Sequence, residues 1–379
     1  MNKNNFSKVI LLLLCVVFMI SAVSCDSDIL GTNSNENNND HSQLDNANGN
    51  YDNGNNTNNV TTDTDKTVCV NHVYTQGYCS VCGEKQPPMS VNGDKVYFGS
   101  YPQTKVTDSV VISSLNALAG ELPTSDNSQS WVDCGYIISD EVSSFTWYID
   151  LETGGEKYRG VYFSSYRPIW TSYDSSAKNS YQDENGYDLN TVYWFKYEPI
   201  SWTVLEKNDG SALILCDMII DSQEYYPCTQ FPAENPPYAN NYEYSTIRAW
   251  LNDDFYNTAF NDLQKNMILT TTVDNSVEST RYSPNENVCP NTDDKVFLLS
   301  YDEAYKYLDE PNRYGKTPTD YAQSQGAYYY QKRGDWWLRS PYSDNTHSAL
   351  LISYRSDLSI YTVYYTSHGV VPAMTITLN

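Results

Sequence analysis

The sequence predicts an α+β fold in which most strands run antiparallel. Stretches with the periodicity of a helix are few, whereas short apolar stretches typical of strands are many. Long polar loops separate these stretches, so neighbouring strands have no need of a helical crossover. About 290 residues follow an N-terminal polar segment, which is enough for one large domain or two small ones.

Residues 1–24 have the pattern of a lipoprotein signal peptide. Lys3 and Lys8 precede an apolar run, 9–20. This run is shorter than the roughly 20 residues of a membrane span. Small residues and then Cys25 follow, and this resembles the bacterial lipobox, whose cysteine carries the lipid. The sequence therefore predicts lipid anchoring at Cys25 on the extracellular face of the cell membrane. An ordinary signal peptide and a retained membrane anchor are the alternatives.

Residues 25–66 form a polar segment rich in Asn and Asp. Such a composition offers almost no apolar surface to bury, so the entropy lost on folding is not repaid. We expect a disordered tether that carries the folded part away from the membrane.

A short cysteine–histidine module is expected at 67–88. Its residues have the spacing of metal ligands, with one pair followed by a second pair after a turn: Cys69, His72, Cys79 and Cys82. Four protein ligands predict a closed, structural zinc site resembling a zinc ribbon, because a segment this short has no core of its own. A disulfide between two of the cysteines is the alternative in an oxidising exterior.

The composition limits the partners of the protein. The formal net charge is −24, so we expect repulsion from nucleic acid and a preference for neutral or cationic ligands. The chain has 35 tyrosines against 10 phenylalanines, and tyrosine suits both sheet edges and polar ligands. A monomer is expected.

The first elements of the folded part follow from apolar spacing. A strand is expected at 94–104 and a helix at 108–120, where Asp108 can cap the helix and Gly120 can end it. Two strands bent at Pro199 are then expected.

The remaining elements continue this α+β pattern. A buried strand is expected at 212–220 and a helix at 245–260, whose apolar residues share one face. A helix at 300–308 begins with a capping box of Ser300 and Glu303. Strands are expected at 334–341 and in three later segments, "SALLISY", "SIYTVYY" and "VVPAMTITL".

Residues 94–379 resemble a bacterial family known as domain of unknown function 6273. The stretches that carry the resemblance are "VYFGSYPQT", "YWFKYEPISWTVLE", "YEYSTIRAWLNDDFYNTAF", "VFLLSYDEA", "DWWLRSP" and "HGVVPAMTI". The resemblance implies a C-type-lectin-like fold, which also carries the formylglycine-generating enzymes. Val371 stands where the family has an arginine, so no role of that arginine carries over.

The sequence shows no nucleophile with a base at a spacing typical of an enzyme. Only His347 and His368 follow the cysteine–histidine module, and a surface position is expected for both. Cys216 is expected to be buried, and Cys228 and Cys289 are the candidate pair for a disulfide. Paired carboxylates of a carbohydrate-active enzyme stay open as an alternative, since acidic residues are abundant.

Glu310-Pro311-Asn312 matches one of the two motifs with which C-type lectins bind calcium and sugar. The second motif, Trp-Asn-Asp, is absent, because Trp337 is followed by Leu338. Calcium at this tripeptide is therefore the weaker expectation.

The segment "WWLRS" has two interpretations. In the first, Trp337 lies in the core and Arg339 forms an ion pair inside the fold. In the second, aromatic and arginine side chains form a ligand-binding rim made of Trp336, Arg339, Tyr342 and Tyr329. With this rim, the protein would recognise an extracellular glycan or glycoprotein; an enzyme or a structural envelope protein is the alternative.

Overall fold

The computed structural model describes residues 89–138, 141–143, 145–171, 180–227, 238–308 and 315–378, together with one short hairpin nearer the N-terminus. All of them belong to one compact unit, Val60–Asn379. The hairpin consists of β1 (Tyr74–Thr75) and β2 (Tyr78–Cys79). None of the helices in these ranges has the length and hydropathy of a membrane span.

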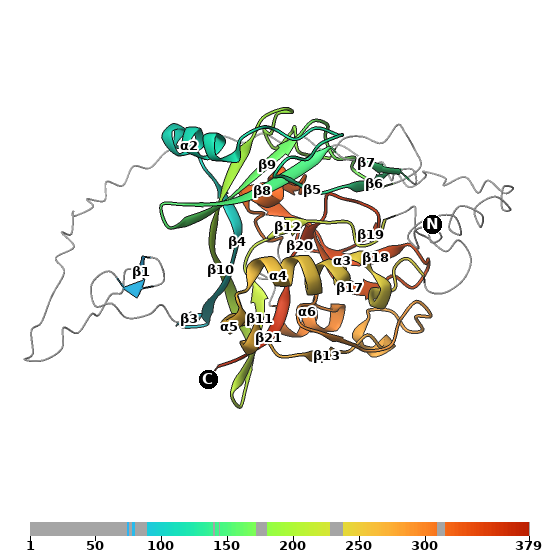
Figure 1. Ribbon diagram of the computed structural model, residues 1–379. Coiled ribbons are helices and arrows are strands. Elements are labelled where there is room, and N and C mark those ends of the chain that lie inside the picture. The colour runs from blue at the N-terminus through green and yellow to red at the C-terminus, as the bar shows by residue number, and fades with distance from the viewer. Residues whose placement is uncertain are drawn as a thin grey trace, which may run out of the picture. The chain divides into compact units, whose positions relative to one another are not determined.

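A large antiparallel sheet forms the first layer (Figure 1). Its strands run in the order β21–β11–β10–β9–β8–β5, while β4 pairs with β10 and β3 pairs with β4. Their bounds are β3 (Met89–Asn92), β4 (Lys95–Lys105), β5 (Val132–Asp133), β8 (Thr146–Thr153), β9 (Glu156–Phe163), β10 (Tyr193–Asn208), β11 (Ser211–Cys216) and β21 (Ala373–Thr377). The predicted strands at 94–104 and 212–220 are thus confirmed, although β11 ends at Cys216.

β10 corrects one prediction. It is a single strand of 16 residues, and not two strands bent at Pro199. Its pairing with β4 shifts register between Lys196 and Tyr197 and again between Pro199 and Ser201. These irregularities allow Pro199 to lie within one strand. Proline has no N–H to donate, and a bulge removes the need for a ladder hydrogen bond at that position.

The hairpin of β8 and β9 has no counterpart among the predicted elements. Gly154 and Gly155 form its turn with φ values of +62° and +80°. Two residues with positive φ are typical of the tight turns that join antiparallel strands. The sequence "TGGE" therefore indicates a hairpin at this position. Above this hairpin lies helix α2 (Ser109–Ala119), which Asp108 caps as predicted.

A second, smaller sheet has the strand order β12–β20–β17–β18–β19. β17 and β20 run parallel, and the other pairs of this sheet run antiparallel. The bounds are β12 (Asp221–Ser222), β17 (Trp336–Pro341), β18 (Ser348–Ile352), β19 (Leu358–Thr362) and β20 (Gly369–Val370). Three two-stranded antiparallel sheets account for the other strands of the described residues: β6 (Tyr136–Ile138) with β7 (Glu141–Ser143), β13 (Thr271–Val273) with β14 (Thr292–Asp294), and β15 (Tyr329–Tyr330) with β16 (Arg333–Gly334).

Short helices pack beside the sheets. The predicted helix at 245–260 consists of α3 (Thr246–Trp250), a π-helical turn η4 (Leu251–Phe255) and α4 (Tyr256–Ala259). The predicted capping box begins α6 (Tyr301–Tyr307). The other helices in the described residues are η3 (Tyr242–Tyr244), α5 (Asp262–Met267), η5 (Val277–Ser279) and α8 (Asp320–Ser324).

Both sheets and the helix at α3–α4 share one hydrophobic core. It contains Trp202 and Ile214 from the large sheet, Trp337 and Leu350 from the small sheet, and Leu251 from the helix. A second, smaller cluster lies between α2 and the outer strands of the large sheet. The mainly antiparallel α+β class is confirmed for the described residues.

Candidate functional site

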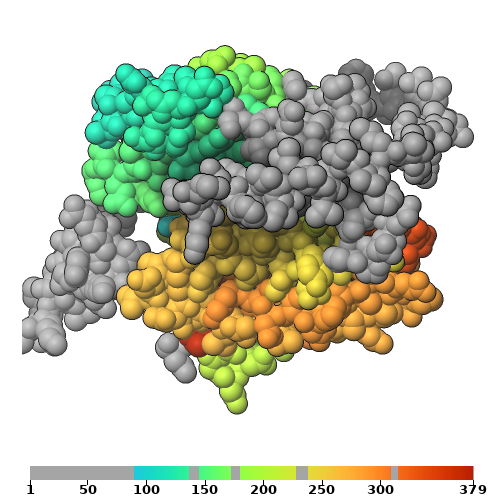
Figure 2. Space-filling view, turned by 45° about the vertical axis from the view of Figure 1, so that its right-hand side comes forward, coloured from blue at the N-terminus to red at the C-terminus, as the bar shows by residue number. Residues whose placement is uncertain are grey.

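A groove lined by both polar and apolar residues lies along the helix that α3, η4 and α4 form. Its volume is about 310 Å³. Its lining residues come from two segments: Gln223, Glu224, Thr246, Ile247, Ala249, Trp250, Asp253 and Asp254. In Figure 2 the yellow segment that contains α3 and α4 lies at the surface, with the orange residues of the later helices below it.

The π-helical turn explains how the helix presents this groove. Ile247, Leu251, Phe255 and Ala259 are all buried and follow one another at intervals of four residues. An α-helix has about 3.6 residues per turn, so three such steps would carry the buried face round by roughly a third of a turn. A wider π turn at η4 corrects this drift. It keeps the apolar residues inside and leaves Asp253 and Asp254 exposed at the groove.

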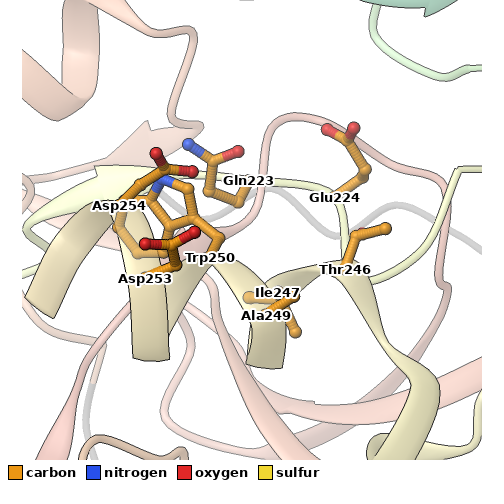
Figure 3. Close-up of a pocket in the computed structure, with 8 residues that line it drawn as sticks. All are labelled: Gln223, Glu224, Thr246, Ile247, Ala249, Trp250, Asp253 and Asp254. Carbon is orange, nitrogen blue, oxygen red and sulfur yellow. The ribbon is translucent and has the colours of Figure 1, made fainter.

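Trp250 is the aromatic centre of the groove. Its ring is half-buried and packs against Phe255, with 5.5 Å between the ring centroids. Figure 3 shows the ring standing beside Asp253, Asp254 and Gln223, with Glu224 and Thr246 toward the other end. Within the described residues, neither the Trp250 indole N–H nor the Asp254 carboxylate has a hydrogen-bond partner.

The opposite side of the groove is held in place by the small sheet. The Gln223 backbone N–H donates to the His368 carbonyl oxygen at 3.1 Å, and the Trp337 indole N–H donates to the Gln223 carbonyl oxygen at 2.9 Å. Glu224 forms an ion pair with the buried Arg167. The backbone at Gln223 and the Glu224 carboxylate are thus fixed before any ligand binds, which lowers the entropy cost of binding.

The two adjacent aspartates differ in their surroundings. Asp253 accepts a hydrogen bond from the Asn257 amide at 2.8 Å. Desolvation by the groove, followed by repulsion from Asp253, raises the pKa of Asp254, although the more distant Arg159 partly offsets this. The end of the groove at Trp250 therefore has two adjacent carboxyl groups without an ion-pair partner in the described residues, and their oxygens suit hydroxyl or ammonium donors.

A second cavity of about 590 Å³ contains Tyr329, one of the predicted binding residues. Lys332 from the same hairpin and Glu198 from β10 also line it. Thr104 donates to the Glu198 carboxylate at 2.6 Å, so part of this lining is already engaged within the protein. Tyr329 itself is half-buried.

The structure supports the interpretation of "WWLRS" as part of the core. Trp336 and Trp337 are fully buried, and Arg339 is 1% exposed. Arg339 forms an ion pair with Glu303 and donates to the Leu298 carbonyl oxygen at 2.7 Å. Trp336 and Arg339 therefore do not reach the surface, as a ligand-binding rim would require. Tyr342 is half-buried and lies in the loop after β17.

The two histidines differ. His347 is exposed, as predicted. The prediction for His368 was wrong, because its side chain is buried against the rings of Trp337, Tyr361 and Tyr365. Its Nδ1 lies 3.6 Å from an Asp335 carboxylate oxygen. Burial lowers the pKa of His368 to about 3 and raises the pKa of Asp335 to about 6.

Several predicted sites lie outside the described residues. Cys25, Glu310-Pro311-Asn312 and Cys228 are among them, so lipidation, calcium at the tripeptide and the disulfide with Cys289 stay predictions. Three of the four predicted zinc ligands, Cys69, His72 and Cys82, also lie there, and of Cys79 the structure gives the backbone in β2.

The residues of the groove were not predicted as a site. Trp250 and Phe255 appeared in the sequence as members of an apolar helical face. The usable signal was "LNDDF", in which two consecutive aspartates interrupt that face next to an aromatic residue. Gln223 and Glu224 gave no signal, because only the fold brings them beside the helix.

Residues 209–378 match the family model described as "Domain of unknown function (DUF6273)". The match begins just before β11 and includes the groove, whereas the resemblance in the sequence extended over 94–379. It supports that resemblance for the C-terminal part of the chain. No curated protein and no solved structure matches the chain.

Proposed function

We propose that this protein is a lipid-anchored bacterial surface protein that recognises an extracellular glycan or glycoprotein in the groove around Trp250. The lipobox at Cys25 and the polar segment 25–66 support the location, since together they would hold a folded domain outside the membrane. The C-type-lectin-like fold implied by the family resemblance is consistent with recognition, but a fold alone assigns no ligand.

One observation carries the proposal. Trp250 presents an aromatic face beside carboxylates and an amide, in a groove of about 310 Å³. Apolar faces of sugars pack on aromatic rings, and their hydroxyl groups donate to carboxylate and amide oxygens. A volume near 300 Å³ lies at the lower end of ordinary ligand pockets, so the groove suits one or two sugar units.

The segment before the domain has a structural role in this proposal. Cys69, His72, Cys79 and Cys82 would hold zinc, and the β1–β2 hairpin reverses the chain between the two pairs of ligands. Such a reversal allows both pairs to meet at one tetrahedral ion. The metal would stabilise the module and would take no part in ligand recognition.

A carbohydrate-active enzyme is the second candidate, on the strength of Asp254. Desolvation, followed by repulsion from Asp253, raises the pKa of Asp254, and a carboxyl group with a raised pKa is suited to act as a general acid. The distance and angle to a sugar bond would decide this role. Release of reducing sugar from a bound glycan would favour the enzyme.

The test is binding of the full chain to an array of bacterial and host glycans, with calcium and again with EDTA. We expect saturable binding, and we expect Trp250→Ala to weaken it at least about tenfold. Tyr305→Ala is the matched control, because Tyr305 is an aromatic residue that is 62% exposed on α6, away from the groove.

Equal binding by the wild type and Trp250→Ala would exclude the groove as the binding site. Thermal unfolding of both variants must accompany the array, because a loss of binding counts only if the variant remains folded. Loss of binding in Tyr305→Ala with unchanged Trp250→Ala would move the site to α6.

A further inference from the structure

A cavity of about 590 Å³ lies beside the hairpin of β15 and β16 and shares no lining residue with the groove around Trp250. Its walls come from the end of β4, from β10, from α8 and from the turn of the hairpin. They carry charged side chains of both signs, namely the carboxylates of Glu198 and Asp320 and the ammonium group of Lys332. The proposed glycan recognition leaves this cavity without a role.

Each of the two carboxylates is oriented by one hydrogen bond within the described residues. Oε2 of Glu198 accepts from the Thr104 hydroxyl at 2.6 Å, and Oδ2 of Asp320 accepts from the Lys105 backbone N–H at 2.8 Å. Both residues are half-buried, and in the described part of the chain neither carboxylate has an ion-pair partner. The second oxygen of each carboxylate can therefore accept a hydrogen bond from a ligand.

Lys332 lies in a strained turn. Tyr330 pairs with Arg333, so Gln331 and Lys332 alone form the turn of the hairpin, with φ values of +50° and +66°. Turns with positive φ at both positions usually contain Asn and Gly, because a Cβ atom makes this conformation unfavourable. Strain of this kind is found mainly at functional sites. The Thr317 hydroxyl donates to the Lys332 carbonyl oxygen at 2.8 Å and thus joins the turn to the cavity wall.

The cavity keeps its opposite charges apart. Among the described residues, Lys332 has no carboxylate within ion-pair distance, although Glu198 and Asp320 line the same cavity. A ligand with one ammonium group and one carboxylate would pair with both kinds of charge, whereas a ligand of a single sign would be repelled by one of them. Pro318 and the half-buried Tyr329 add apolar surface to the lining.

Short peptides with free ends carry both charges together with apolar side chains. We propose that the cavity binds such a peptide, with its ammonium group at Glu198 and Asp320 and its carboxylate at Lys332. The volume of about 590 Å³ lies within the usual range of ligand pockets, about 300–1,000 Å³. The net charge of −24 disfavours anionic ligands, but not a peptide whose charges cancel. This site does not depend on the proposed glycan recognition.

The test is equilibrium dialysis of the full chain against an equimolar library of tripeptides, with mass spectrometry to identify those that are retained. The same library is used with acetylated amino ends, with amidated carboxyl ends and with both ends blocked. We expect free tripeptides to be retained. Calorimetry of a retained tripeptide should show a loss of affinity of at least about tenfold for each single block. Retention of no tripeptide, or equal affinity of the free and blocked forms, would overturn the proposal.

Substitutions test which wall contacts which end of the peptide. Glu198→Gln should weaken binding of the free tripeptide at least about tenfold but leave the acetylated form nearly unchanged, because both changes remove the same ion pair. Lys332→Gly should behave in this way toward the amidated form. Gln331→Gly is the matched control, since it relieves positive φ in the same turn and retains the charge of Lys332. It should leave binding unchanged, and both glycine variants should unfold at a higher temperature than the wild type.

Two further results would contradict the proposal. If Lys332→Gly and Gln331→Gly bind the tripeptide equally well, the ammonium group of Lys332 takes no part in binding. If Glu198→Gln weakens the free and the acetylated forms by the same factor, its carboxylate does not contact the amino end. Thermal unfolding of each variant shows whether a loss of binding reflects a loss of folding. Asp320→Asn provides the same test from the second carboxylate if Glu198→Gln lowers the unfolding temperature.

Discussion

The strand β17 and the helix formed by α3, η4 and α4 both place a tryptophan near charged residues, but in opposite environments. In β17 all six residues are buried, and Arg339 is satisfied by Glu303 and by backbone carbonyls. On the helix, Trp250 is half-buried, and Asp253 and Asp254 face solvent without a cationic ion-pair partner in the described residues.

The position of each element explains the difference. β17 pairs with β18 on one edge and β20 on the other, and both of its faces are covered, so every side chain points into protein. The helix is covered on one face, so only every fourth residue from Ile247 to Ala259 is buried and the residues between them reach the surface. The aromatic motif "WWLRS" therefore lies in the core, whereas the groove is lined by residues from two separate segments that form no motif.

The largest expected effect comes from removing the buried cation of β17. Arg339→Ala leaves Glu303 and several backbone carbonyls without their donor, so we expect the free energy of unfolding to fall by about 3–5 kcal/mol. Denaturation by urea measures the change. Arg355→Ala is the control, because Arg355 is exposed and should change stability by less than about 0.5 kcal/mol. Equal effects of the two variants would contradict the core role of Arg339.

The pair of His368 and Asp335 should show how the core beside β17 responds to acid. The folded state excludes a proton from His368 down to about pH 3, whereas the unfolded chain accepts it below about 6.5, so acid destabilises the fold through His368. Asp335 acts in the opposite direction, because its folded pKa of about 6 exceeds the ordinary 3.8. Between pH 6 and 4 the two contributions offset each other.

Substitutions separate the two contributions. When the pH falls from 6 to 4.5, the free energy of unfolding of Asp335→Asn should decrease by about 2 kcal/mol more than that of the wild type. A proton that only the unfolded state binds lowers this free energy by about 1.4 kcal/mol for each pH unit of acidification. His368→Phe, which keeps a ring against Trp337 and Tyr361, should instead gain stability over the same range relative to the wild type. Urea denaturation at both pH values measures this, and the same acid dependence in all three proteins would rule out the offset.

The sequence predicted those features that depend on nearby residues. Asp108 at the start of α2 and the capping box of Ser300 and Glu303 were confirmed, because a cap is formed by residues two or three positions apart. Apolar periodicity was enough for β4 and for the helix at 245–260. The mainly antiparallel α+β class followed from the number and length of such stretches.

Features that depend on distant contacts could not be predicted in this way. Whether Trp336 faces core or solvent depends on β18 and β20, which pair with β17 from later in the chain. The burial of His368 depends on rings from β17 and β19 and the loop after it. The groove needs Gln223 beside Trp250, and no pattern within either segment indicates that proximity.

The smallest expected effect comes from removing a charge in the groove, and it is to be compared with the loss of the buried charge of Arg339 in β17. Asp254→Asn removes a carboxylate whose pKa is raised by desolvation and by Asp253, so the ionised form is disfavoured in the folded protein. Because a raised folded pKa costs stability once pH exceeds the ordinary value, the variant should be slightly more stable at pH 7, by less than about 0.5 kcal/mol. Urea denaturation at pH 7 measures the change. Removing a charge would then destabilise β17 and slightly stabilise the helix. A loss above about 1 kcal/mol would instead make Asp254 a structural residue, because a residue kept for ligand binding contributes little to the unliganded fold.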